Sequence, residues 1–574
     1  MAYFQNAREF NVNNLSIRNV TNGPWNSSTG KSPLERLEET IAPGALHNSE
    51  ERCDAPKCHP ETRVAVQNEI LSWISKGDTD NEPTKMMWLT GPAGSGKTAI
   101  AGSIAEACKK EGILAASFFF SSFSGSANRR SKKCLVATLA YQIRQQPSLR
   151  LRAMGPDDFH EDEPPTALQQ YGKLMLRSIE HDPAIFSKRL SSQVEELILK
   201  PLRRLHSLID HSTFPKVIVI DGLDECKAGK EQSQSRPLHG GSKPRTDADD
   251  QLEILSALML AAKDPAFPFR ILISSRPERA ISTFFESPEF NNATVNIFLD
   301  EKYGPDDDIA LFLRSKFAEN RRIYNLSSAW PPEEAIRMLV ADASGQFIYV
   351  TTVLRFVEAG PNPPPSQLDT VLKLRPSIQG SNPFALLDAL YTLILMSSPN
   401  PRCAASWIQI TQSFITRNIN TNELAVERLP AVFSRQLLET TPGEGEHLLG
   451  NLRSLISIPP SDNTIAPYRT YHKSLLDFIE DRSRSSAIFG KWRWLNSPKG
   501  MFEDAVSWVL KNKGPRIPLT TELEADLFFD QFLSLVATEL RATTVTYDVS
   551  WWAKKILSRP DPDRAFSGDN LVQT

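Results

Sequence analysis

The sequence predicts an α/β fold, in which a parallel sheet carries helices on both faces and is followed by a long helical region. Short, predominantly apolar runs, typical of buried parallel strands, alternate with segments of helical periodicity up to about residue 300. Beyond that point the periodicity is almost entirely helical. A glycine-rich turn joins the first apolar run to the next helix, which is typical of sheets that bind ligands at their carboxyl edge.

The expected elements alternate in a regular order through the first half of the chain. Strands are expected over residues 86–89, 113–120, 217–220 and 269–274. Helices are expected over 63–74, 97–110, 132–146, 167–179 and 193–209. Residues 227–250 are rich in Lys, Ser, Gly, Pro and Asp and have no periodicity, which predicts a mobile insertion.

The second half of the chain is predicted to be mostly helical. Helices are expected over 307–320, 332–343, 347–358, 502–511, 525–540 and 551–558. A short strand pair is expected at 455–458 and 468–471, inside a mixed unit that follows a proline-rich link at 361–365.

Composition and charge exclude several classes of protein. Lys and Arg number 65 against 68 Asp and Glu, a net charge of -3, which argues against a polybasic protein that binds nucleic acid through its phosphates. The first ten residues lack the features of a secretory signal. The longest apolar stretch, 384–396, is too short to span a membrane. The 6 scattered cysteines are typical of reduced thiols, so a cytoplasmic protein is expected.

The most informative motif is a turn between an expected strand and the helix after it. It fits G-x-x-x-x-G-K-[ST] and is predicted to bind nucleotide through each of its residues: Gly91, Pro92, Ala93, Gly94, Ser95, Gly96, Lys97 and Thr98. Glycines let successive backbone N–H groups face a phosphate, and the helix N-terminus adds positive potential. Lys97 is expected to reach the β- and γ-phosphate oxygens, and the hydroxyl of Thr98 to bind Mg²⁺.

A second motif places carboxylates at the same edge of the sheet. The apolar run 217–220 leads directly into Asp221, which is expected to hold Mg²⁺ together with Thr98. Asp224 and Glu225 follow in the next turn, where either carboxylate could polarise an attacking water molecule. The sequence leaves open which of the two acts as the base.

A third motif supplies a cation at the edge of the sheet. The run 271–273 ends in Ser274-Ser275-Arg276, so the guanidinium of Arg276 is placed to sense a γ-phosphate. The order along the chain, a phosphate loop, then an acidic strand, then an arginine strand, suits a sheet that hydrolyses nucleotides.

These three motifs resemble those of the NACHT family, within the STAND class of signal-transduction NTPases. Further stretches resemble the fungal members, which are also similar to the N-terminal NTPase region of nephrocystin: 58–63 (CHPETR), 138–142 (TLAYQ) and 345–350 (GQFIYV). The resemblance covers roughly residues 55–480. In this family a small residue follows the Mg²⁺-binding aspartate and further acidic residues come soon after; Gly222, Asp224 and Glu225 match that pattern, and Arg276 matches the sensor arginine.

The resemblance also implies a domain order and one further site residue. The polar composition at the start of the chain predicts a disordered N-terminal segment (1–45), and helical periodicity predicts a helical C-terminal region (481–574). Between them, the resemblance implies a nucleotide-binding domain (46–300), a helical domain (301–360) and a winged-helix-like domain (361–480). The run 471–478 (YHKSLLDF) resembles the end of the family's winged helix. The resemblance therefore implies that His472 approaches the β-phosphate of bound ADP.

The function implied is that of a switch. ADP would hold the domains together, ATP would favour an open form that self-associates, and slow hydrolysis would reset it, in fungal innate-immunity or incompatibility signalling. The alternative is a constitutive AAA+-like ATPase that remodels a protein or nucleic acid. The sequence does not decide between ATP and GTP. It identifies neither protein partners nor the sensor repeats usual in such proteins.

Overall fold

The computed structural model describes the chain between residues 31 and 555. Its description omits residues 54, 77–82, 123–125, 146–166, 207–214, 229–244, 292, 300, 361, 375–383, 414, 418–425, 461–462, 491–496, 540–547, 549 and 553–554. The expected tail up to residue 30, most of the expected insertion at 227–250 and most of the helix expected at 551–558 lie outside the described residues.

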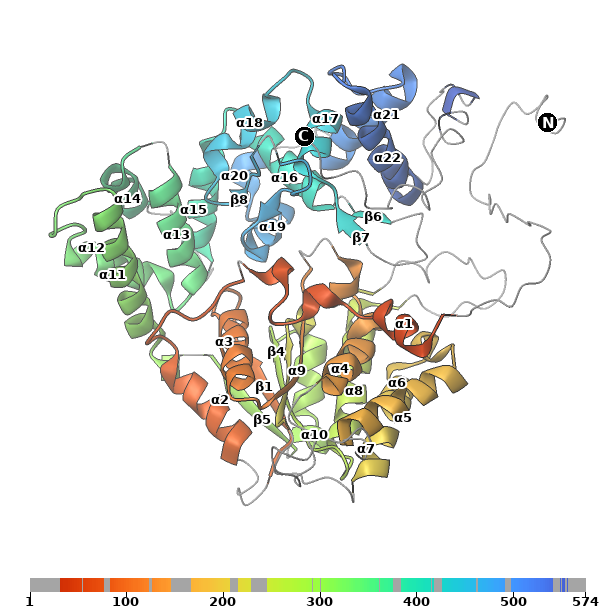
Figure 1. The fold of residues 1–574 in the computed structure, drawn as a ribbon. Coiled ribbons are helices and arrows are strands. Elements are labelled where there is room, and N and C mark those ends of the chain that lie inside the picture. The colour runs from red at the N-terminus through yellow and green to blue at the C-terminus, as the bar shows by residue number, and fades with distance from the viewer. Residues whose placement is uncertain are drawn as a thin grey trace, which may run out of the picture.

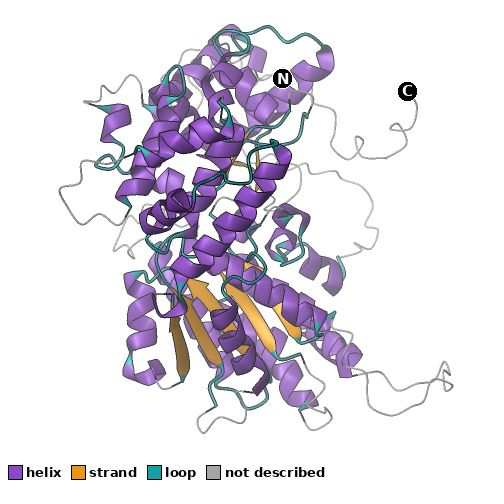
Figure 2. Cartoon of the chain, turned by 90° about the vertical axis from the view of Figure 1, so that its left-hand side faces the viewer, coloured by secondary structure: helices purple, strands orange, loops and turns teal. Residues whose placement is uncertain are grey.

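A five-stranded sheet forms the centre of the lower half of the molecule (Figures 1 and 2). Its strands are β1 (Met86–Thr90), β2 (Leu114–Phe119), β3 (Val217–Asp221), β4 (Arg270–Ser275) and β5 (Thr294–Phe298). They lie in the order β2-β3-β4-β1-β5, and all neighbouring pairs are parallel. β5 was not expected from the sequence, because this edge strand is only partly buried and its polar Asn296 interrupts the apolar run.

Helices cover both faces of the sheet, so the predicted fold class is confirmed. Met87 and Leu89 of β1 pack on one face with α2 (Val64–Lys76) and α3 (Lys97–Lys110). Met86 and Trp88 alternate onto the other face. That face is covered by α4 (Leu135–Arg144), α5 (Ala167–His181), α6 (Leu190–Val194), α7 (Lys200–Leu205), α8 (Asp247–Ala262) and α9 (Arg279–Glu286), with α10 (Pro288–Asn291) beside them.

The segment before the sheet is ordered from residue 31 onward, although the sequence predicted disorder through residue 45. Ser32 and Glu35 form a capping box that starts α1 (Pro33–Glu38). Leu37 and Ala45 are fully buried in the core of the sheet domain. The polar composition of the segment concealed these few apolar anchors, which are enough to order it.

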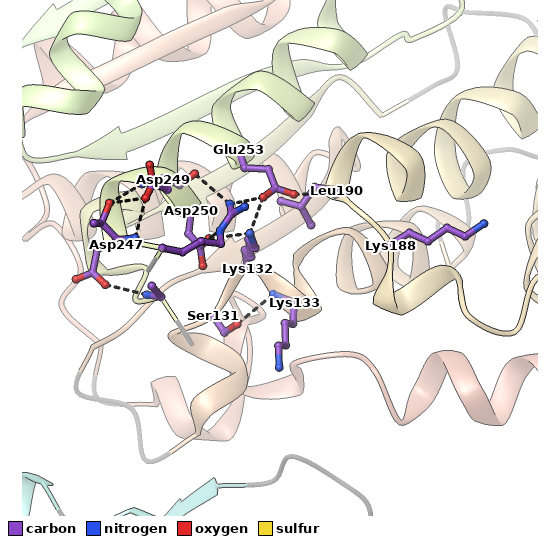
Figure 3. Close-up of polar contacts among 12 residues, drawn as sticks. Ser131, Lys132, Lys133, Lys188, Leu190, Asp247, Asp249, Asp250 and Glu253 are labelled. Carbon is purple, nitrogen blue, oxygen red and sulfur yellow. Dashed lines mark hydrogen bonds and ion pairs between the residues drawn. The ribbon is translucent and has the colours of Figure 1, made fainter. Parts of the chain in front are cut away.

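The helix α8 begins inside the region expected to be an insertion. Asp247 accepts hydrogen bonds from the Lys227 ammonium and the Ala228 N–H, both at 2.8 Å, so the described ends of the insertion are joined. Lys132 lies beside this junction and pairs with Asp250 at 2.7 Å and Glu253 at 2.5 Å (Figure 3). These charged contacts explain why a stretch of polar residues is nevertheless ordered.

The upper half of the molecule is largely helical (Figure 1). It contains α11 (Pro305–Ile323), α12 (Glu333–Ala343), α13 (Phe347–Ala359), α14 (Pro364–Leu372), α15 (Ala385–Met396), α16 (Pro401–Ser413), α17 (Ala431–Leu438), α18 (Glu444–Leu449), α19 (Lys473–Glu480), α20 (Ser486–Phe489), α21 (Pro498–Asn512) and α22 (Glu522–Glu539). Two small antiparallel pairs join them, β6 (Ile415–Arg417) with β7 (Val426–Arg428), and β8 (Ile456–Ser457) with β9 (Arg469–Thr470). The second pair was expected from the sequence. One hydrophobic core runs through this half from Ile309 to Trp552.

None of the helices in the described part of the chain combines the length and the apolarity that crossing a membrane requires.

Candidate nucleotide-binding site

The phosphate loop lies between β1 and α3, as its motif requires. Gly94 adopts φ +79°, and a Cβ there would lie 2.2 Å from Cγ2 of Ile348, the second residue of α13. Gly96 has φ +94° and caps α3 with open space around it. The loop thus needs glycine at residue 94 for two reasons, a left-handed backbone and direct contact with the helical half.

Lys97 is folded over the loop. Its ammonium donates hydrogen bonds to the carbonyl oxygens of Gly91 and Pro92, both at 2.8 Å. Burial lowers the pKa of Lys97 to about 8, and nearby carboxylates, Asp224 foremost, oppose that shift. The lysine is therefore held where anionic oxygens would offset the cost of its burial.

The two residues expected to hold a metal lie together. Asp221, at the end of β3, is 2% exposed and accepts a hydrogen bond from the hydroxyl of Ser274, and the hydroxyl of Thr98 also favours its charged form. Burial raises the pKa of the Asp221 carboxyl group, while the two hydroxyls oppose the rise. A carboxylate and a hydroxyl at one point are oxygen donors of the kind that Mg²⁺ prefers, so these residues fit that ion.

The two carboxylates in the acidic turn after β3 have different hydrogen-bonding partners. Asp224 accepts the backbone N–H of Arg276 at 3.1 Å and lies 3.5 Å from that residue's Nε. Glu225 accepts hydrogen bonds from the backbone N–H of Ser122 at 2.7 Å and from its hydroxyl at 2.9 Å. Burial, reinforced by the charge of Asp224, raises the pKa of Glu225. The raised pKa makes Glu225 a stronger base than an ordinary glutamate.

Arg276 connects the two halves of the molecule. Its guanidinium lies 3.0 Å from the carboxylate of Asp477 on α19, in addition to its contact with Asp224. Figure 1 shows α19 at the base of the upper half, facing the sheet. The arginine is thus shared between an acid of the sheet edge and an acid of the helical half.

His472 caps the N-terminus of α19. Its Nδ1 accepts the backbone N–H of Ser474 at 3.1 Å, which leaves the ring proton of the neutral imidazole on Nε2. Burial is the main reason why the pKa of His472 falls to about 3. Four cationic side chains lower it further: Arg276, Lys97, Arg355 and Lys473. His472 therefore lies among cations that converge from both halves of the molecule, close to the phosphate loop.

Arg63 joins the loop to the helical half. Its guanidinium donates to the carbonyl oxygen of Ser95 at 3.0 Å, and its backbone N–H donates to Asp308 of α11 at 3.0 Å. The guanidinium carbon also lies 5.0 Å from the ring centre of Phe347. Two of the stretches that carried the family resemblance, 58–63 and 345–350, therefore meet at the phosphate loop.

Sequence reasoning assigned no role to several residues that hold the site. Gln251 of α8 donates to the carbonyl oxygens of Asp224 at 3.3 Å and Cys226 at 3.4 Å, which fixes the acidic turn. Ser122 and Asp477 bind groups more than a hundred residues away in the chain. Of the residues that support the site, only Ser274 lies within a motif that the sequence identified, two positions before Arg276.

A family model described as nephrocystin 3, N-terminal, matches residues 64–276. That range contains the phosphate loop, the acidic turn and Arg276. The chain carries a P-loop NTPase domain. No curated protein matches the sequence.

Among solved structures, the similarities are distant. A Walker-type ATPase of Pyrococcus abyssi is 12% identical with a TM-score of 0.32, covering 74% of this chain and 98% of its own. The ORC2 protein of Aeropyrum pernix, in ADPNP–ADP complexes, is 13% identical with a TM-score of 0.30, covering 76% and 98%. Drosophila ORC bound to DNA is 11% identical with a TM-score of 0.24, covering 73% and 93%. Scores of this size transfer no function to the P-loop NTPase described here.

Proposed function

We propose that the protein is a nucleotide-controlled signalling switch of the NACHT/STAND type, which binds ATP and ADP with Mg²⁺ and hydrolyses ATP slowly. The observation that carries this proposal is the position of Arg276, which lies between Asp224 of the sheet edge and Asp477 of the helical half. A residue expected to sense a γ-phosphate is thereby also a connection between the two halves.

The proposed binding mode uses the loop and the charges around it. The backbone N–H groups of residues 91–98 and the ammonium of Lys97 bind the phosphates. Thr98 and Asp221 hold Mg²⁺, which when bound neutralises charge on the β- and γ-phosphate oxygens. His472, with its proton on Nε2, donates a hydrogen bond to the β-phosphate of ADP.

The proposed hydrolysis uses Glu225 as the base. Glu225 accepts a proton from water as the water oxygen attacks the γ-phosphorus, and the bond to the bridging oxygen of ADP breaks. The raised pKa of Glu225 favours this proton transfer, whereas Asp224 is occupied by Arg276. Arg276 stabilises charge on the transferring phosphoryl group, but only after it releases Asp477.

The proposed switch follows from that competition. In the ADP state, Asp477 and Asp224 share Arg276, and the halves stay closed. A γ-phosphate offers Arg276 a stronger, doubly charged partner, so ATP favours a form in which α19 is released. The open form then self-associates, and hydrolysis restores the closed form.

The biological setting remains part of the same proposal. We place the switch in the cytoplasm, in fungal innate-immunity or incompatibility-type signalling, with protein partners rather than nucleic acid. The division into domains at residues 45, 300, 360 and 480 is proposed on the same resemblance.

The decisive experiment is mass spectrometry of the nucleotide that copurifies with the full chain, combined with native mass before and after addition of ATP. The expected result is a monomer that holds ADP and assembles once ATP replaces it. A freshly purified hexamer with rapid, continuous ATP hydrolysis would contradict the switch and favour the AAA+-like motor. The same measurement with GTP decides whether the protein prefers adenine or guanine nucleotides.

A further inference from the structure

Arg52 occupies an unexplained position beside the proposed metal site. It ends the short turn Glu50–Arg52, before the range matched by the family model. Its guanidinium carbon lies 3.6 Å from the ring centre of Phe119, the last residue of β2. Phe119 is the register partner of Asp221 on β3, so the guanidinium stacks beside the strand end that presents the metal-binding carboxylate.

The same guanidinium also reaches α3. A Cβ placed on Gly102 would lie 3.9 Å from Nη2 of Arg52. Gly102 is four residues after Thr98, and residues at this spacing share one face of a helix. Arg52 therefore lies between β2, whose Phe119 is the register partner of Asp221, and α3, which carries Thr98.

The largely buried side chain of Arg52 has one donor, Nε, without a hydrogen-bonding partner among the described residues. The residue is 9% exposed, and its Nε makes no hydrogen bond within the described part of the chain. Burial lowers the pKa of Arg52 to about 10, with Asp221 opposing the shift, so the side chain stays charged at neutral pH. The face of Phe119 and the charge of Asp221 offset part of the cost of burial, but Nε itself remains without a hydrogen bond.

The turn that carries Arg52 is firmly attached to the sheet domain. Glu51, its neighbour, pairs with Arg129 at 3.1 Å. The backbone N–H of His47 donates to the hydroxyl of Ser117 at 3.0 Å, and that of Ala42 donates to the hydroxyl of Thr138 at 2.9 Å. These contacts fix the backbone of the turn, so the Arg52 side chain starts from a defined position beside Phe119.

We propose that Arg52 is a binding residue for the metal-bound phosphates of a nucleoside triphosphate, supplied by the segment that precedes the NTPase domain. The inference rests on the proposed nucleotide site. A planar guanidinium matches phosphate oxygens in geometry and charge, and Nε of Arg52 has a hydrogen bond still to donate. Because binding energies are reciprocal, triphosphate binding then also tightens the docking of residues 31–53.

The test measures the affinity of the full chain for β,γ-imido-ATP and for ADP, both with Mg²⁺, by isothermal titration calorimetry. Arg52→Met keeps an unbranched chain on Phe119 but removes the donors. We expect it to weaken β,γ-imido-ATP at least about tenfold and ADP much less. Arg52→Lys restores the charge without the fork and should recover part of the loss. Arg36→Met, on α1 of the same segment, is the matched control and should change neither affinity.

Each outcome decides the point. A loss confined to the triphosphate in Arg52→Met, with the melting temperature of the nucleotide-free protein unchanged, supports the assignment. Unchanged affinity for β,γ-imido-ATP, a loss confined to ADP, or an equal loss in Arg36→Met overturns it. If the unaltered protein binds neither nucleotide, the proposed function fails. If the unaltered protein binds both nucleotides and Arg52→Met binds them equally well, the proposed function stands and this inference fails.

Discussion

The lower and upper halves of the molecule contribute to the candidate site in different ways. The sheet half supplies a continuous loop, residues 91–98, and a compact acidic turn after β3, both built largely from local backbone geometry. The helical half supplies single side chains: Ile348 near the start of α13, His472 at the N-cap of α19, and Asp477 within α19. Under the proposed function, the sheet half binds the nucleotide, whereas the helical half controls closure of the molecule and retention of ADP.

The largest effect should come from the sheet half. Lys97→Ala removes the only ammonium that donates to the loop carbonyls within the described residues, and with it the charge placed for phosphate. We expect nucleotide affinity to fall more than about hundredfold in calorimetry.

Lys110→Ala, at the far end of the same helix, is the control and should bind as the unaltered protein does. Undiminished ADP in purified Lys97→Ala would show that the phosphate loop is assigned wrongly.

The contact between the halves should be sensitive at Gly94. Gly94→Ala meets Ile348 and needs a left-handed backbone, so we expect a loss of about 2–4 kcal/mol in the free energy of unfolding. Gly96→Ala has only the backbone cost, about 1–2 kcal/mol, since its surroundings are open. Chemical denaturation measures both. Equal losses of unfolding free energy in the two variants would mean that Ile348 of the helical half does not pack against the loop at Gly94.

A pH series should reveal the partly buried His472 of the helical half. The pKa of His472 is about 3 in the folded protein against 6.5 ordinarily, so its contribution is complete above about pH 6.5 and declines as the pH falls. We expect the unaltered protein to lose about 1–2 kcal/mol more than His472→Asn between pH 7.5 and pH 5.

Asparagine keeps the cap of α19 without a titratable ring. The raised pKa values of Asp221 and Glu225 act in the opposite direction, but they are common to both proteins and cancel in the difference. Parallel pH profiles would place His472 outside the closed interface.

The smallest effect should come from the ion pair between the halves. Asp477→Asn weakens the contact with Arg276. Because both side chains are partly exposed, we expect the interaction free energy between the halves to fall by about 1 kcal/mol. We expect ADP to dissociate about fivefold faster in stopped-flow displacement. Glu480→Gln on the same helix serves as the control. An unchanged dissociation rate would remove Asp477 from the closed state.

The sequence predicts most of the sheet half because its signals are local. Wholly apolar runs marked four strands, and helix α3 was expected with its observed limits because a glycine-rich turn precedes it. The strand β5 escaped prediction because half-buried edge strands lack a continuous apolar run. The ordered segment around α1 escaped because few of its residues are apolar.

The site residues that sequence reasoning missed escaped for a different reason. The partner of Glu225 is Ser122, and the partner of Arg276 is Asp477, 201 residues away. Such pairs arise only when the chain folds back, so no periodicity or motif marks them. Arg52 was passed over for the same reason, since its neighbours Phe119 and Asp221 are distant in sequence.

The continuous core of the helical half also limits how this protein can be cut. Phe528 of α22 is almost fully buried, and its ring centre lies 5.3 Å from that of Phe433 on α17. A fragment that ends near residue 480 would expose this aromatic contact to water. Residues 497–539 therefore belong to the core of the helical half, and we expect a chain cut near residue 480 to lose solubility.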